Sequence, residues 1–222
     1  MTRLELLLSL SARVYGVGVE FGAGSLPFPL PERVRIRYAD RNTLAHLREK
    51  RSFGDAPLTT PALQSDLESM DGIEDDSLDF IIASHVIEHT RNPLRVLEQA
   101  YRKLRMAGQL ILVVPDKEAT FDRDRALTGL SHFILDFESP SRERDFEHYV
   151  EFFSKAVPQP DPVFAARGPF EQEHDIHFHT WTYESFGEMV TYACRSISPW
   201  TSVWSQARLS AKDIEFYYVL RK

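Results

Sequence analysis

Three carboxylates stand where short apolar segments of this chain end, and together they could bind the polar groups of a nucleoside. Glu20 lies inside the first apolar run, Asp40 closes the second run 18 residues after Gly22, and Asp66 follows a third short segment. A carboxylate at a strand end can accept hydrogen bonds from both ribose hydroxyls, and another can accept from an adenine amine. Each acid alone is as well explained as a cap or turn residue, so the prediction depends on their joint placement.

A glycine turn follows the first of these apolar runs. Gly22 and Gly24 flank a single residue, and glycines let a backbone turn sharply and approach a ligand closely. In an open α/β sheet, such a loop at the carboxyl end of a strand is where a nucleotide-like cofactor binds. The dinucleotide fingerprint G-x-G-x-x-G is incomplete, because Pro27 stands in place of its third glycine. An ordinary strand and turn is therefore the alternative.

Two segments contain histidines that could perform acid–base or metal chemistry. The first runs from His85 to His89 and matches H-x-x-E-H, a zinc-protease pattern that places two histidines on one helix face. It directly follows an apolar run instead of lying within a long helix, which disfavours that interpretation. In the second segment, His177 and His179 would point the same way on a strand. Metal binding is one alternative for this pair, but a place in a substrate pocket or plain packing is favoured.

The elements that must position these residues alternate between apolar runs and helical patterns. Strands are expected at Val17–Phe21, Val34–Ala39, Leu78–Ser84, Gln109–Val114, Trp200–Trp204 and Ile214–Leu220, and helices at 2–14, Thr43–Lys50, Arg123–Phe137, Arg142–Ala156 and Thr182–Cys194. One further helix begins at Asn92-Pro93, carries an apolar stripe through Leu104 and ends at Gly108. Alternation of this kind predicts a parallel sheet with helices on both faces.

Residues 116–176 interrupt the alternation with about sixty residues, which is long for an α/β connection. We expect them to form a helical cap over the carboxyl edge of the sheet, with a proline-rich loop from Pro158 to Pro169. Their aromatic residues favour burial: Phe121, Phe133, Phe137, Phe146, Tyr149, Phe152 and Phe153. The predicted domains are therefore a core of 1–115 and 177–222 and an insert of 116–176. A dimerisation arm is the alternative for the insert, so a homodimer stays open.

Composition excludes several classes of function. The net charge is -7 and no basic block stands out, so a nucleic-acid partner is not expected. The single cysteine, Cys194, excludes an internal disulfide and a multi-cysteine zinc site. No apolar run approaches the roughly 20 residues that span a bilayer, and the N-terminus lacks the order of a signal peptide. We expect a cytoplasmic protein without a membrane partner.

Taken together, five motifs resemble the class I S-adenosylmethionine-dependent methyltransferases, and especially their small-molecule branch. These motifs are Glu20–Gly24, Tyr38–Asp40, Ser65–Leu67, Leu78–His89 and Gly108–Pro115. The resemblance covers residues 14–116 well and 177–222 more loosely. It implies a Rossmann-like, seven-stranded, mostly parallel sheet with an antiparallel last strand, which suits the run that ends at Leu220.

The resemblance also implies a cofactor, S-adenosylmethionine, and a role for each matching residue. Glu20, Gly22 and Gly24 would line its methionine and ribose part, Asp40 with Arg41 would hold the ribose, Asp66 and Leu67 would flank the adenine, and Ser84 and His85 would sit beside the sulfonium. The expected reaction is direct displacement of the methyl group onto a hydroxyl of a small or medium-sized acceptor, without a metal. His85 is the first candidate base, with His89, His177 and His179 behind it. A methyltransferase-like binding or scaffold protein without turnover is the alternative.

Overall fold

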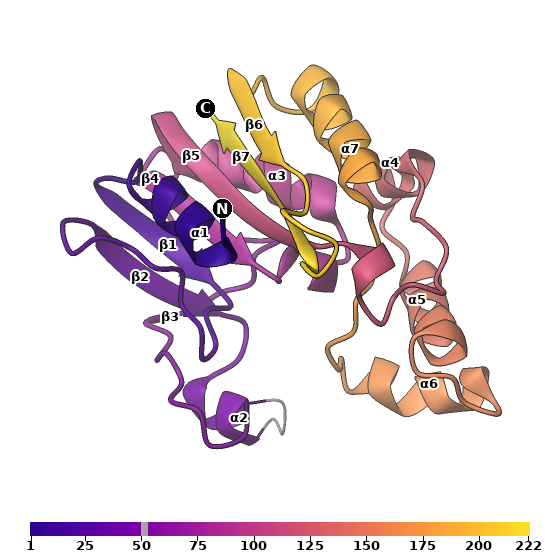
Figure 1. The fold of residues 1–222 in the computed structure, drawn as a ribbon. Coiled ribbons are helices and arrows are strands. Elements are labelled where there is room, and N and C mark those ends of the chain that lie inside the picture. The colour runs from indigo at the N-terminus through magenta and orange to yellow at the C-terminus, as the bar shows by residue number, and fades with distance from the viewer. Residues whose placement is uncertain (50–52) are drawn as a thin grey trace.

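The computed structural model describes residues 1–49 and 53–222 and contains one sheet with helices packed on both of its faces (Figure 1). The strands are β1 Val17–Phe21, β2 Arg35–Asp40, β3 Leu63–Gln64, β4 Leu78–Ser84, β5 Leu104–Pro115, β6 Ser202–Gln206 and β7 Glu215–Arg221. The α-helices are α1 Arg3–Ser11, α2 Leu44–Glu49, α3 Pro93–Lys103, α4 Leu130–Glu138, α5 Arg142–Lys155, α6 Pro162–Glu171 and α7 Tyr183–Ser196, and two 3-10 turns are η2 Ile87–His89 and η3 Lys117–Ala119.

The seven strands follow the order β3-β2-β1-β4-β5-β7-β6. Strands β1 to β5 are mutually parallel, whereas β7 is antiparallel to both of its neighbours. This arrangement confirms the predicted Rossmann-like, mostly parallel sheet and its antiparallel last strand. Strands β1 and β4 have the predicted bounds, while β2 and β7 are displaced by one residue and β6 by two. The helix predicted to reach Lys50 is described only as far as Glu49, because residues 50–52 lie outside the described part.

Alternating side chains of the central strands supply two separate hydrophobic cores. Ile81 of β4 faces the layer formed by α3 and α7, whereas Phe80 and Ile82 face α1. Helix α1 turns Leu6 and its apolar neighbours toward this second face, and Thr2 caps its first turn. In Figure 1, α1 lies in front of the sheet and α3 behind it. The sheet is therefore covered on both sides, as the sequence predicts.

The connection from β1 to β2 contains no helix within residues 22–34, all of which the structure describes. Prolines are frequent here, and a proline lacks the N–H that a helix interior requires. The loop is instead fixed by Glu20, whose two carboxylate oxygens accept hydrogen bonds from the Phe28 N–H at 2.9 and 3.1 Å. The side chain of Phe28 then packs into the core beneath α1. Glu20 thus anchors the loop, although the resemblance assigns it to the cofactor.

The protonation of Glu20 gives a first prediction. Burial raises the pKa of Glu20 to about 7, and the hydrogen bond from Phe28 offsets only part of this rise. In the unfolded chain the pKa of Glu20 lies near 4.5. Between pH 4.5 and 7, Glu20 is therefore protonated in the native protein but ionised in the unfolded chain. Stability from this group is thus complete below pH 4.5 and is lost as pH rises through 7. As the pH rises from 4.5 to 8, the free energy of unfolding of Glu20→Gln should increase relative to that of the wild type by at most about 3 kcal/mol.

Urea unfolding of both proteins across this pH range measures the gain. Glu32→Gln, a change in the exposed part of the same loop, is the matched control and should show no such pH dependence. A constant difference between Glu20→Gln and wild type would show that Glu20 is already ionised in the native protein.

The boundary between α3 and β5 differs from the prediction. Helix α3 ends at Lys103, and Leu104 pairs with Leu78 as the first residue of β5. The register then shifts before Phe80, and Ala107 has a φ of 64°, which is typical of a bulge. Gly108 therefore lies within the strand and does not end the helix. Leu104 lies at a position that continues the apolar stripe of the helix, but it is buried as part of a strand. Apolar periodicity alone does not distinguish these two cases.

Residues 116–176 contain three α-helices that lie together to one side of the sheet (Figure 1). The helix expected from Arg123 begins only at Leu130, and its Phe133 packs into the main core. Helices α5 and α6 enclose a small core of their own, with Tyr149 at its centre. Of the seven aromatic residues predicted to be buried, Phe121 is 55% exposed.

The proline-rich segment that was expected to be a loop instead contains α6. Pro162 occupies the first turn of this helix, where its missing N–H costs nothing, and the Asp161 side chain accepts a hydrogen bond from the Phe164 N–H. Only Pro169 lies inside the helix, within its last turn. The position of the prolines, and not their number, therefore determines whether this segment forms a helix. In the part of the chain that the structure describes, no helix combines the length and apolarity needed to cross a membrane.

Candidate functional site

The carboxyl ends of four adjacent parallel strands form one edge at which most of the predicted site residues meet. Phe21 at the end of β1 pairs with Ala39 of β2 and with Ala83 of β4, so the residues that follow these three positions leave the sheet at the same level. Asp40 pairs with Gln64 of β3, which extends the same edge by one strand. Ligands of open α/β sheets bind at this edge.

The glycine turn has a backbone that only glycine adopts easily. Gly22 has a φ of +65° and Gly24 a φ of +52°, both in the left-handed region. A Cβ on Gly22 would lie 2.6 Å from Val86 Cγ2, and one on Gly24 would lie 2.9 Å from Phe53 Cε1. A valine at position 22 would thus strain the loop itself, so this substitution cannot report on cofactor contact alone.

The edge also presents polar atoms that suit a nucleoside. Asp40 Oδ1 accepts hydrogen bonds from the Asn42 backbone N–H at 2.7 Å and from its side chain at 3.1 Å, while no hydrogen bond reaches Oδ2 within the described residues. Beyond Asp40, the buried hydroxyl of Ser65 has no hydrogen-bond partner in the described part of the chain. Asp66 Oδ1 accepts from the Glu68 N–H at 2.7 Å, and the side chain of Leu67 is buried in the main core.

Arg41, predicted to bind the cofactor, connects this edge to the last residues of the helical insert. Its guanidinium forms an ion pair with Asp175 and donates to the Glu173 carbonyl at 3.2 Å. The segment continues across the end of β4, where the Phe178 N–H donates to the Glu88 carbonyl at 2.7 Å. Residues from both sides of the insert therefore border the same edge.

His85 follows Ser84 at the end of β4 and has a φ of 54°, an uncommon conformation for a residue other than glycine. Its Nε2 lies 2.7 Å from Glu215 Oε2, and its Nδ1 lies 3.7 Å from Glu88 Oε1. Burial lowers the pKa of His85, but the hydrogen bond to Glu215 and the charge of Glu88 outweigh it and raise the pKa above its ordinary value. The two carboxylates therefore stabilise the imidazolium form of His85 relative to that of a free histidine.

Glu215 is the anion that stabilises this charge. It also accepts hydrogen bonds from Arg3 at 2.6 Å and from the Tyr217 hydroxyl at 2.5 Å. Burial would raise the pKa of Glu215, but the hydrogen bonds from His85, Arg3 and Tyr217 lower it to about 2. The histidine at the strand end is thus held by a carboxylate that stays ionised at neutral pH.

A second acid–base group lies on the other side of Glu88. The Glu88 side chain is 1% exposed, and within the described residues neither of its oxygens has a hydrogen-bond partner. His177 Nε2 lies 4.0 Å from Glu88 Oε1, and His177 Nδ1 lies 2.5 Å from Asp122 Oδ2. His89 Nδ1 donates to the Ile176 carbonyl at 2.9 Å, which leaves its Nε2 unprotonated when the ring is neutral.

Asp122 holds the His177 ring in one orientation. Burial would raise the pKa of Asp122, but the hydrogen bonds from His177 and Arg125 lower it. An ionised Asp122 accepts the proton on His177 Nδ1, so Nε2 is the nitrogen that can take a proton from elsewhere. Glu88, His89 and His177 also bring one ligating atom each to within 4.8 Å of one another, a spacing that a metal ion could bridge.

Comparison with known proteins agrees with this geometry. Residues 17–112 match the family described as methyltransferase domain, a range that includes the glycine turn, Asp40, Asp66 and the segment from Ser84 to His89. Residues 17–112 therefore carry the sequence pattern of a methyltransferase domain. The cofactor of this class of domain is S-adenosylmethionine.

Individual relatives are distant. The uncharacterized protein MJ1123 of Methanocaldococcus jannaschii is 28% identical over 104 residues, and the match spans 47% of each chain, so the chain covers about half the length of this curated relative. A Thermotoga maritima structure described as an S-adenosylmethionine-dependent methyltransferase and possible histamine N-methyltransferase has a TM-score of 0.52 at 16% identity, covering 97% of this chain and 87% of the other. An S-adenosylmethionine-dependent methyltransferase of Aquifex aeolicus has a TM-score of 0.50 at 12% identity, covering 99% and 89%. These two likenesses concern the fold alone.

The structure does not show the geometry required by two alternatives that the sequence left open for these histidines. His177 and His179 do not point the same way: His177 contacts Asp122, whereas His179 lies beside His132 and His148 in a separate cluster. The segment that carries them is not a strand, so its residues do not follow the alternation of a pleated sheet. The zinc-protease pattern also lacks its helix, because His85 precedes the three-residue turn η2.

Several groups at the edge of the methyltransferase domain have no recognisable signal in the sequence. Asp122, Glu215 and Arg3 lie far from the glycine turn in sequence, and each contacts a site histidine or its partner carboxylate. Phe121 stacks near His177 with ring centroids 4.6 Å apart. The buried hydroxyl of Ser65 was included only within a matching motif. Long-range contacts of this kind require the folded chain.

Proposed function

We propose that this protein transfers the methyl group of S-adenosylmethionine to a hydroxyl of a small acceptor that binds between the carboxyl edge of the sheet and residues 116–176. The observation that carries the proposal is the convergence of the glycine turn, Asp40 and the Glu88–His177 pair at that edge. Residues 1–115 and 177–222 would then form the catalytic core, and residues 116–176 the wall of the acceptor pocket.

The residues present fit the cofactor. Among the residues that the structure describes, the Ser65 hydroxyl and Asp40 Oδ2 have no hydrogen-bond partner, and they are polar atoms of the kind that a nucleoside satisfies. The left-handed Gly22 lets the backbone approach closely. Asp40 with Arg41 would hold the ribose, Ser65 and Asp66 the adenine, and Ser84 the methionine end. When bound, S-adenosylmethionine supplies an electrophilic methyl group on a sulfonium.

We assign the removal of the acceptor proton to His177. The 4.0 Å gap between its Nε2 and Glu88 Oε1 is too long for a hydrogen bond between them, so Nε2 is left to accept the single proton of an acceptor hydroxyl. Asp122 would stabilise the imidazolium that forms. His85, the first candidate from sequence, is disfavoured as the base because its carboxylate neighbours raise its pKa. His179 has no place in this step.

Phe121 gives a prediction for the acceptor pocket. Its ring is exposed and lies beside His177, so an acceptor held against Glu88 would pack on it. Replacing Phe121 by alanine should raise the acceptor KM about 3- to 10-fold, the value of one aromatic contact, with little change in kcat or cofactor affinity. Phe164→Ala, which removes an exposed ring on α6, is the matched control. Steady-state kinetics in which kcat falls and KM stays constant would contradict this assignment.

Release of S-adenosylhomocysteine tests the proposed reaction directly. The chain is incubated with S-adenosylmethionine and panels of phenols, sugars and other small alcohols, alongside amines as the competing class. Product that depends on a hydroxyl acceptor supports the proposal, whereas turnover confined to amines would reject the hydroxyl assignment and keep the methyl transfer.

A further inference from the structure

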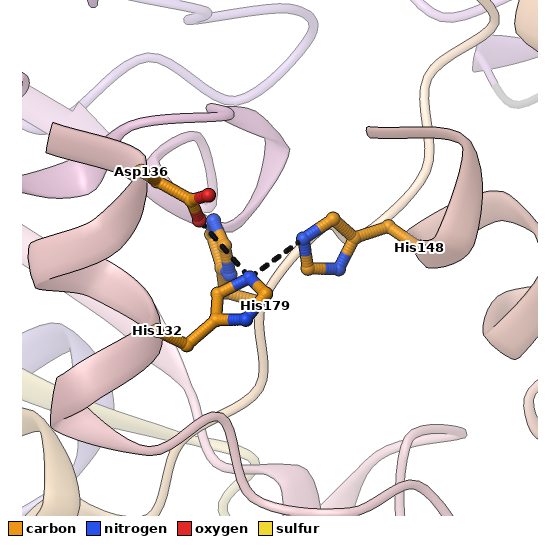
Figure 2. A group of neighbouring side chains, drawn as sticks. All are labelled: His132, Asp136, His148 and His179. Atoms are coloured by element: carbon orange, nitrogen blue, oxygen red, sulfur yellow. Dashed lines mark hydrogen bonds and ion pairs between the residues drawn. The ribbon is translucent and has the colours of Figure 1, made fainter. Parts of the chain in front are cut away.

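A second group of ligating side chains lies within the helical insert, apart from the residues assigned to methyl transfer. His132 and Asp136 occupy positions i and i+4 on α4, His148 comes from α5, and His179 comes from the segment before α7. One ligating atom of each lies within 4.8 Å of the other three. Figure 2 shows the four side chains converging from these three segments.

The side chains in this group have more hydrogen-bond acceptors than protons to share among them. His132 Nε2 lies 3.0 Å from His148 Nε2 and 3.0 Å from Asp136 Oδ2, so a single N–H on His132 has two acceptors before it (Figure 2). The carboxylate can only accept. A cation between these atoms would satisfy all of their lone pairs at once.

His179 adds an independent sign of a missing partner. Its Nε2 lies 3.0 Å from the Arg91 carbonyl oxygen, and because a carbonyl only accepts, Nε2 carries the proton. Nδ1 therefore keeps its lone pair. This nitrogen is buried and has no hydrogen-bond partner among the described residues, and the side chain is 1% exposed. A buried polar atom without a partner is rare and indicates an unseen ligand or water.

Outer contacts hold two of the four groups in the way that metal ligands are usually held. The proton of His179 is fixed by the Arg91 carbonyl, and the second oxygen of Asp136 accepts a hydrogen bond from Arg144 Nε at 2.8 Å. Histidine ligands commonly donate their other N–H to a carbonyl, and carboxylate ligands are themselves hydrogen-bonded. The arrangement therefore has both the ligands and the supports of a metal centre.

We propose that His132, Asp136, His148 and His179 bind a structural Zn²⁺ ion. Three imidazole nitrogens and one carboxylate oxygen are zinc ligands, and four protein ligands are typical of a closed structural site. Bonds of about 2.1 Å place tetrahedral ligands about 3.4 Å apart, close to the 3.0 Å contacts seen here. This proposal departs from the sequence-based expectation that the chain holds no metal, but it leaves the methyl displacement itself without one.

The ion would join the insert to the core. Helices α4 and α5 carry three of the ligands, while His179 is hydrogen-bonded to Arg91 in the connection between β4 and α3. That connection begins with the segment that carries Glu88, and the segment before His179 carries His177. Zinc at this position would thus fix the insert against the residues assigned to proton transfer.

Metal analysis of the full chain tests the proposal, with any polyhistidine tag removed. The apoprotein is titrated with Zn²⁺ against a chromophoric chelator and, separately, with Co²⁺. We expect one equivalent of zinc per chain and the intense visible absorption of tetrahedral Co²⁺. At a hundredfold excess of free zinc over its dissociation constant, the melting temperature should rise by roughly 5–10 °C.

Substitutions locate the ion. His132→Asn and His148→Asn should each weaken zinc binding more than about 100-fold, since loss of an outer partner alone costs about 10- to 100-fold. His46→Asn, at an exposed position on α2, and His177→Asn, in the Glu88 group, should both keep the full metal content. If a variant fails to fold, the cobalt spectrum of the wild-type chain still shows whether a tetrahedral metal site is present.

Two results would overturn the proposal. One is a wild-type chain that binds no stoichiometric zinc and shows only the weak absorption of hydrated Co²⁺. The other is metal that survives both His132→Asn and His148→Asn but is lost in His177→Asn, which would transfer the site to Glu88, His89 and His177.

Discussion

Replacing His177 by asparagine is expected to lower kcat by about 10²- to 10⁴-fold, the usual contribution of a positioned base. The reason is geometric: His177 is the histidine whose Nδ1 is held by an ionised carboxylate and whose Nε2 faces Glu88. Cofactor affinity should stay unchanged, because His177 lies on the segment after the insert and not at the glycine turn. Single-turnover kinetics with saturating cofactor measure the effect on chemistry.

Two companion variants separate a chemical role from a structural one. His174→Asn changes an exposed histidine three residues away and should leave the rate unaltered. Asp122→Asn keeps the shape of the group that contacts His177 but removes its charge. It should therefore lower kcat and shift the pH dependence of kcat. The melting temperature of His177→Asn should stay close to that of the wild type. A His177→Asn enzyme with wild-type turnover would remove His177 from proton transfer and return the role to His85 or His89.

The second large effect concerns the cofactor. Asp40→Ala should weaken S-adenosylmethionine binding about 10- to 150-fold, which corresponds to roughly 1.5–3 kcal/mol for hydrogen bonds to a charged group. Oδ1 of Asp40 already accepts from Asn42, so the substitution also loosens the turn after β2. Calorimetric titration of the cofactor into the folded variant measures the loss.

Asp40→Asn refines this test because it keeps an acceptor for Asn42 while removing the charge. It should therefore bind the cofactor with intermediate affinity. Asp71→Ala, at an exposed acid between β3 and β4, is the control and should bind as the wild type does. Unchanged affinity in Asp40→Ala would place the ribose elsewhere and remove Asp40 from the site.

The parts of the fold that sequence predicted well are those determined by local apolar pattern. Strands β1 and β4 appear with the predicted bounds, because their runs are buried on both faces and end at Gly22 and His85. The shared edge was predictable for the same reason, since parallel strands must bring their carboxyl ends together. The placement of Asp40 and Asp66 at this edge was therefore predictable from their spacing.

The sequence-based predictions fail where a specific contact or residue position overrides the apolar pattern. Leu104 fits a helical stripe but pairs with Leu78, and Pro162 fits a loop but opens α6. Glu20 resembles a ligand-facing acid, yet the fold turns it toward the Phe28 amide. The partner of Leu104 lies 26 residues away, whereas Pro162 and Glu20 depend on nearer contacts that apolar periodicity does not show.

The histidine clusters illustrate the same limit. His132 and His148 attracted no attention in the sequence because neither lies in a recognisable metal-binding spacing with His179, more than thirty residues beyond His148. Only the packing of α4 against α5 and the path of the segment before α7 bring them together. His177 and His179 are close in sequence, yet they serve different clusters.

Titration of S-adenosylmethionine into the wild-type chain by calorimetry tests the central claim most directly. We expect one cofactor molecule per chain, saturation below about 1 mM, and competition by S-adenosylhomocysteine at the same site. A folded chain that gives no specific heat with either compound would contradict the account, and would identify the protein as a methyltransferase-like scaffold that has lost its cofactor.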